Sequence, residues 1–93
     1  MEAFKKAGGT IKWTPNEAVL HEGVEVAGKI NRLEKVIYLG KDANYGTLAE
    51  ELLHYEQFER AGVWGQGTLL RSVANAMEAE VKILLKFMGF VRP

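Results

Sequence analysis

The chain contains no cysteine. Disulfide bonds, thiolate metal ligands and cysteine nucleophiles are therefore excluded, and folding does not depend on an oxidising compartment. Any metal site has to be built from histidine, aspartate and glutamate side chains. Histidine is scarce too, with only two in the chain, His21 and His54. Each of them can be considered on its own as a candidate ligand.

The chain also lacks net charge and long apolar runs. Twelve basic and twelve acidic residues cancel to a net charge of zero. No overall field attracts a phosphate backbone or an anionic membrane, so we expect no nucleic-acid partner. No stretch approaches the roughly 18 apolar residues of a membrane helix, and the opening "MEAFKKAGGT" lacks the apolar run of a signal peptide. We expect neither membrane insertion nor a signal peptide in this domain.

The 93 residues are predicted to form a single domain, 1–93. Its sequence pattern changes near residue 46. The β-rich part, 1–46, holds short runs interrupted by Gly, Pro and Asn, which predict small antiparallel strands. Helical patterns follow over 47–62 and 69–88. The predicted fold class is α+β: a small antiparallel sheet of about three strands, within "GTIKW", "GVEVAGKI" and "KVIYLG", followed by two helices. A short helical turn is also compatible with the N-terminus.

The first predicted helix, "TLAEELLHYEQFERAG", has clear boundary residues. Thr47 is suited to cap its N-terminus, with Glu50 completing a capping box, and Gly62 is suited to end it. At about 100° per residue, Glu50, His54 and Gln57 share one side, with Glu51 on the flank of His54. This side is either an active site or the solvated face of an ordinary helix, where glutamates near the N-terminus are favoured by the helix dipole.

One residue of the second predicted helix conflicts with its pattern. Glu80 projects into the apolar face that contains Leu69 and Phe87, where an unpaired carboxylate would cost several kcal/mol. It therefore needs a partner, which could be an arginine or lysine, His54, or a metal ion that His54 also holds. Glu78 falls on the opposite, solvated face.

The segments "TLAEELLHYEQFERAG" and "EAEV" resemble the zincin-like metallopeptidase toxin domains at the C-termini of bacterial polymorphic and contact-dependent toxins. In that family a helix with the motif H-E-x-x-H is followed by a helix that supplies an acidic third metal ligand. The resemblance covers roughly residues 35–88. It implies a minimal zincin-like core and hydrolysis of peptide bonds.

Carried over by position, the resemblance makes Glu51 the catalytic glutamate, His54 a metal ligand and Glu80 the acidic third ligand, with Glu78 as a weaker alternative. Glu50 stands where the family has its first histidine, so the motif here is E-E-x-x-H. Zinc accepts carboxylate oxygen, and a carboxylate-rich site also suits Mn²⁺, so we expect Zn with Mn as a possible replacement.

The mechanism implied by the resemblance uses water activated by the metal, with Glu51 as the base. Gln57, one turn after His54, could orient a ligand or contact substrate. The resemblance further implies a protein substrate and a cognate immunity protein. It also implies delivery into a target cell as part of a larger secreted bacterial protein, with action in the cytoplasm.

Two other classes of function stay open. The domain could be a metallopeptidase-like interaction module that is catalytically inactive, or a metal-independent nuclease that uses His54 and Glu51 on RNA. His21 lies in a predicted strand or turn, from which it could still reach the site and replace the missing imidazole. Trp64, in the glycine-rich connector, is interpreted as an anchor of the core or a lid over the cleft.

Overall fold

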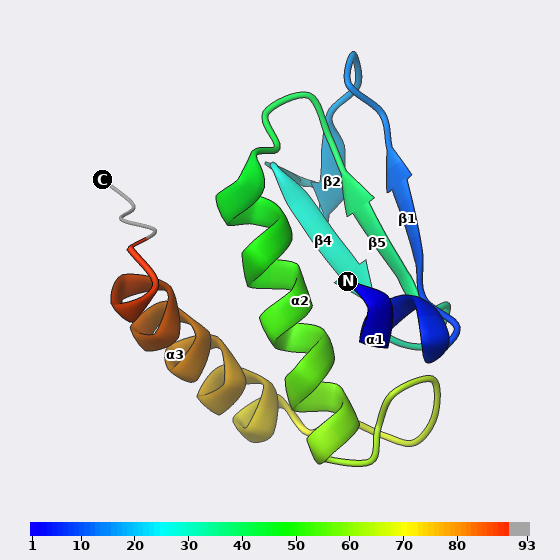
Figure 1. Ribbon diagram of the computed structural model, residues 1–93, viewed down its shortest axis with the longest axis vertical. Coiled ribbons are helices and arrows are strands. Elements are labelled where there is room, and N and C mark those ends of the chain that lie inside the picture. The colour runs from blue at the N-terminus through cyan, green and yellow to red at the C-terminus, as the bar shows by residue number, and fades with distance from the viewer. Residues whose placement is uncertain (90–93) are drawn as a thin grey trace.

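The computed structural model describes residues 1–89, and Figure 1 shows their arrangement. Five short strands in two small sheets are followed by two long helices, which confirms the predicted α+β class. The elements are α1 (Glu2–Lys6), β1 (Thr10–Trp13), β2 (Val19–His21), β3 (Val24–Val26), β4 (Gly28–Asn31), β5 (Val36–Leu39), α2 (Tyr45–Arg60) and α3 (Arg71–Phe87).

The main sheet has the strand order β1-β5-β4. Strands β4 and β5 are antiparallel, whereas β1 runs parallel to β5, with Thr10 opposite Val36. The prediction of a purely antiparallel sheet was therefore wrong for β1. Strand β4, which precedes β5 in the chain, forms an antiparallel hairpin with it and occupies one of its edges. Strand β1, which is further away in the sequence, pairs with the other edge and runs parallel to β5.

A second, two-stranded sheet forms where a single strand was predicted over 23–30. That run is divided, because β3 pairs with β2 and β4 pairs with β5. The β2–β3 hairpin turns at Glu22 and Gly23, which both have positive φ, 53° and 80°. Two consecutive positive φ angles are typical of the tight type I′ turn, and glycine adopts one of them without steric cost.

Helix α2 begins earlier than its sequence predicts. Asn44 is the N-cap, since its side chain accepts a hydrogen bond from the Thr47 backbone N–H at 3.0 Å, and the Thr47 hydroxyl accepts one from the Asn44 N–H. The capping box therefore joins Asn44 and Thr47 rather than Thr47 and Glu50. At the other end, Gly62 has φ 73° and the Val63 N–H bonds to the Phe58 carbonyl. This Schellman arrangement confirms Gly62 as the end of the helix.

Helix α2 lies between the main sheet and α3 (Figure 1). On the side next to the sheet and α1, an apolar cluster joins Phe4, Ile37, Tyr55, Phe58 and Trp64. The Trp64 indole N–H also donates to the Ala7 carbonyl at 3.0 Å. Trp64 is thus an anchor of the core, one of the two roles considered for it. No helix within residues 1–89 combines the length and the apolar character needed to cross a membrane.

Candidate functional site

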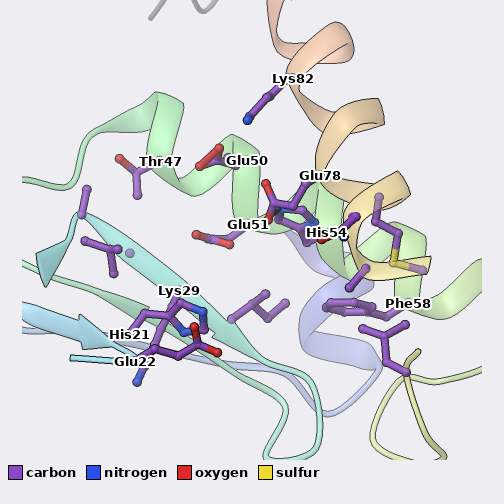
Figure 2. Close-up of a pocket in the computed structure, with 18 of the residues that line it drawn as sticks. His21, Glu22, Lys29, Thr47, Glu50, Glu51, His54, Phe58, Glu78 and Lys82 are labelled. Atoms are coloured by element: carbon purple, nitrogen blue, oxygen red, sulfur yellow. Dashed lines mark ion pairs between the residues drawn. The ribbon is translucent and has the colours of Figure 1, made fainter. Parts of the chain in front are cut away.

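A large cleft lies between the β2–β3 hairpin and β4 on one side and helices α2 and α3 on the other. Its volume is about 830 Å³, which is within the size range of small-ligand and substrate pockets. Figure 2 shows Glu50, Glu51, His54 and Glu78 projecting toward it from the helices, with His21 and Lys29 on the opposite wall.

Helix α2 contributes two buried ionisable side chains to the wall of this cleft. Glu51 is 5% exposed and His54 is 7% exposed, and both line the cleft. They lie three residues apart, so they share one side of the helix. Burial of an imidazole and a carboxylate is costly unless both are well bonded, and every buried side-chain nitrogen or oxygen in residues 1–89 has a hydrogen-bond partner.

The imidazole of His54 is held through both of its nitrogens. Nδ1 lies 2.9 Å from the Gln57 amide oxygen, and Nε2 lies 3.1 Å from a carboxylate oxygen of Glu78. The ring also stacks on Phe58, with centroids 6.2 Å apart and planes at 20°. These contacts fix the plane of the ring and direct Nε2 toward the cleft and α3.

The acidic residue of α3 that meets His54 is Glu78, and the structure does not bring Glu80 to this histidine. Glu80 instead accepts hydrogen bonds from the Gln57 amide at 3.0 Å and from Arg60 at 2.9 Å. The bond from Gln57 first, and then the bond from Arg60, lower the pKa of Glu80. The ion pair with Arg60 was one of the partners considered for Glu80.

The orientation of α3 explains this difference. The predicted apolar face contained Phe87, yet Phe87 is 85% exposed, and the buried residues of the helix are Val81 and Leu85. Helix α3 packs mainly on α2, so it buries a narrow side, and Val73, Ile83 and Phe87 stay exposed. This rotation places Glu78 beside the cleft and leaves Glu80 outside it, with about half of its side chain exposed.

The other predicted site residues differ in whether they line the cleft that His54 borders. Glu50 and Glu51 line the cleft with it, and Gln57 bonds it directly. His21 ends β2 and is exposed on the opposite wall, which confirms its placement in a strand or turn. Trp64 lies in the apolar core and is not among the residues that line the cleft.

The charge around the cleft is mixed. Its basic residues are Lys29, Arg71 and Lys82, and its acidic residues are Glu22, Glu50, Glu51 and Glu78. A lining of both signs offers no continuous positive track for a polyanion. It is compatible with a peptide, which presents alternating polar backbone groups and side chains of either charge.

No set of three histidine, aspartate or glutamate side chains within residues 1–89 converges closely enough to hold a metal ion as the side chains are arranged. The predicted set of Glu50, His54 and Glu80 is therefore not assembled. What the structure does bring together is one pair of donors, His54 Nε2 and Glu78, with Glu50 and Glu51 lining the same cleft.

Comparison with protein-family models, curated proteins and solved structures finds no match to this chain. The resemblance to metallopeptidase toxins therefore stays a hypothesis that depends on a short motif. The geometry around His54 is the observation on which a function can be proposed.

Proposed function

We propose that the protein is a metal-dependent hydrolase of peptide bonds whose reaction takes place in the cleft beside His54. The observation that carries this proposal is a buried histidine at the wall of a large cleft, with its Nε2 atom 3.1 Å from the carboxylate of Glu78. Structural histidines are common in protein interiors. A histidine that borders a substrate-sized cleft and faces an acidic side chain there is more typical of a catalytic or metal-binding site.

The donor pair fits a metal ion in chemistry and in spacing. Two ligands of a tetrahedral zinc ion, with bonds of about 2.0–2.2 Å, lie about 3.3–3.5 Å apart. The separation of Nε2 and the Glu78 oxygen, 3.1 Å, is close to that value. Glu50 lies one helical turn before His54, so a change of its side-chain rotamer could bring a third donor to the pair. Zinc suits this set of ligands, and its two carboxylates would also accept manganese.

The residues of the cleft divide the remaining tasks. A bound divalent ion supplies acidification of water and polarisation of a carbonyl oxygen. Glu51, buried in the same wall, is the candidate to accept the proton of the attacking water and to pass it to the leaving amine. Gln57 and Phe58 hold the ring of His54 in place. Glu80 has no part in binding the ion, since Arg60 and Gln57 engage its carboxylate.

The biological setting is proposed from the resemblance alone. It would make the domain the C-terminal effector of a larger bacterial toxin that is delivered into a target cell, where it cleaves a protein in the cytoplasm. A cognate immunity protein would protect the producing cell. The mixed charge of the cleft supports a protein substrate over a nucleic acid.

Metal content and peptide hydrolysis test the proposal together. Protein purified without chelators or a histidine tag is analysed by mass spectrometry for zinc and manganese, and its activity is measured on a library of internally quenched peptides. We expect one equivalent of metal and a hydrolysis that chelators abolish and added zinc or manganese restores. His54→Ala and Glu78→Gln should both lose the metal.

Glu56→Gln is the matched control, because it removes the same charge from an exposed position of α2 that does not line the cleft and should leave the metal in place. Absence of metal from the wild type, or retention of metal in Glu78→Gln, would contradict the proposal. Degradation of RNA that chelators do not affect would favour the nuclease alternative. Complete inactivity combined with tight binding of a partner protein would favour the interaction module.

A further inference from the structure

Gln57 is a buried polar residue that joins α2 to α3 at the back of His54. It is 5% exposed. Its amide nitrogen donates to the backbone carbonyl of Met77 at 2.9 Å and to the carboxylate of Glu80 at 3.0 Å. Its amide oxygen lies 2.9 Å from Nδ1 of His54. One side chain therefore connects the imidazole to two groups of the neighbouring helix.

The two partners on α3 determine which way this amide points. A backbone carbonyl only accepts hydrogen bonds, and so does an ionised carboxylate. Arg60 Nη2 donates to the same Glu80 oxygen at 2.9 Å, and because a guanidinium can only donate, that oxygen acts as an acceptor. Rotation of the amide by 180° would place its oxygen against both acceptors and break both bonds. The oxygen of Gln57 must therefore face His54.

An amide oxygen has no hydrogen to offer, so Nδ1 of His54 has to carry one. The 3.1 Å contact of Nε2 with the Glu78 carboxylate is a hydrogen bond only when Nε2 also carries a hydrogen, in the imidazolium. A neutral imidazole has a single N–H, so in that form Nε2 keeps its lone pair, and the Glu78 side chain, which is 56% exposed, has room to turn away from it. Free histidine in water favours the opposite tautomer, with the hydrogen on Nε2. Histidines that bind metal commonly donate their other N–H to a fixed acceptor in this way.

We propose that Gln57, oriented by the Met77 carbonyl and the Glu80 carboxylate, is a positioning residue that holds His54 in its Nδ1–H tautomer and so keeps Nε2 available as a donor. Arg60 and Glu80 act only through Gln57. The consequence for metal binding rests on the proposed function, whereas the tautomer itself does not. In this arrangement Glu80 is not a metal ligand. It orients Gln57, and Gln57 in turn orients His54.

The tautomer can be observed directly by NMR. Two-bond hydrogen–nitrogen correlation spectra of the ¹⁵N-labelled chain, recorded over a series of alkaline pH values, identify which ring nitrogen carries the hydrogen. The measurement is made on metal-free protein, in the wild type, Gln57→Leu and Gln57→Glu. His21 is exposed and serves as an internal reference in the same spectra. It should show the ordinary Nε2–H form in all three proteins.

We expect His54 of the wild type to be the Nδ1–H tautomer and His54 of Gln57→Leu to change to the Nε2–H tautomer. Gln57→Glu retains an acceptor next to Nδ1 and should retain the wild-type tautomer, although it loses the bonds to α3. Zinc affinity, measured by competition with a chromogenic chelator, should fall about 10–100-fold in Gln57→Leu.

Three results would overturn the inference. The first is an Nε2–H tautomer at His54 in the wild type, and the second is an imidazolium at every pH at which the protein stays folded. Both are read from the wild type, so they do not depend on whether a variant folds. The third is an unchanged tautomer in a folded Gln57→Leu. A wild type with the Nδ1–H tautomer but no affinity for zinc or manganese would instead contradict the proposed function and leave the role of Gln57 standing.

Discussion

The two sides of helix α2 differ in how they are stabilised. One side carries Tyr55 into an apolar cluster with Phe4 and Trp64, whose rings meet at centroid distances between 4.9 and 5.7 Å. The other side carries His54 and Gln57, which are just as buried but are held by hydrogen bonds to α3. The first side stabilises the fold through apolar burial, which is not directional. The second depends on a particular orientation of every donor and acceptor.

The contrast suggests a division of roles. Changes on the apolar side should affect the stability of the protein without altering the chemistry of the cleft. Changes on the polar side should affect activity more than stability, provided that the replacement can still form hydrogen bonds. Four substitutions test this division, beginning with the strongest effect.

Glu51→Gln should have the strongest effect on the polar side. The amide keeps the shape of the side chain but cannot accept a proton from water, so under the proposed function the hydrolysis rate should fall about 10²–10⁴-fold. Metal content and thermal stability should stay close to those of the wild type. Glu56→Gln is the control, because Glu56 is exposed on the same helix. Full activity in Glu51→Gln would remove this residue from the mechanism.

Trp64→Ala should have the strongest effect on the apolar side. Removing a fully packed indole leaves a cavity and costs about 3–5 kcal/mol, a large part of the roughly 5–15 kcal/mol by which domains are stable. Urea unfolding followed by far-UV circular dichroism measures the loss. Trp13→Ala provides the comparison, since Trp13 is 65% exposed and its removal should change the stability by no more than about 0.5 kcal/mol. Similar losses for both variants would contradict the assignment of Trp64 to the core.

Tyr55→Phe should have a smaller effect, which depends on pH. The hydroxyl lies 3.1 Å from the Ala3 carbonyl oxygen and 3.2 Å from a Glu59 carboxylate oxygen, which share its single hydrogen, so its removal should cost about 0.5–1.5 kcal/mol. Burial, followed by the bond to Glu59, raises the pKa of Tyr55 above its ordinary value. The folded state therefore holds the phenolic proton more tightly than the unfolded state. The wild type should lose stability as the pH rises above about 10, and Tyr55→Phe should lose less over the same interval.

The smallest effect is expected from Glu80→Gln. The bonds from Gln57 and Arg60 lower the pKa of Glu80, so this carboxylate stabilises the fold above its ordinary pKa and loses that contribution as the pH falls through its lowered value. Thermal unfolding between about pH 5 and about pH 3 should show a weaker dependence on pH in Glu80→Gln than in the wild type. An identical dependence in the two proteins would mean that the ion pair contributes nothing in solution.

Much of the fold was predictable from local sequence patterns. The change of sequence pattern near residue 46, the helix that ends at Gly62 and the placement of His21 in a strand or turn all follow from the periodicity and from residues with restricted backbone preferences. The parallel pairing of β1 with β5 was not predictable in this way, because a strand's sequence does not specify which partner it meets. The start of α2 was missed because Asn44 and Thr47 both suit a cap, and the cap that forms is the earlier one.

The candidate site also has a part that was predictable from local sequence and a part that was not. Glu50, Glu51, His54 and Gln57 belong to one helix, so their mutual placement was derived from helical geometry alone. The partner from the second helix was assigned to Glu80, with Glu78 as the weaker alternative, and the structure places Glu78 beside His54. A helical wheel gives the angles between residues of one helix but not the rotation of that helix against its neighbour.

The order of residues is thus enough to derive the α+β class, the motif helix and the neighbours of His54 within it, because these depend on interactions between residues close in the chain. Only the tertiary structure decides that α3 packs through its own residues Val81 and Leu85. This packing turns Glu78 toward the imidazole of His54 and Glu80 toward Arg60. The rotation of one helix on another is set by how their side chains fit together, and that fit involves residues distant in the sequence.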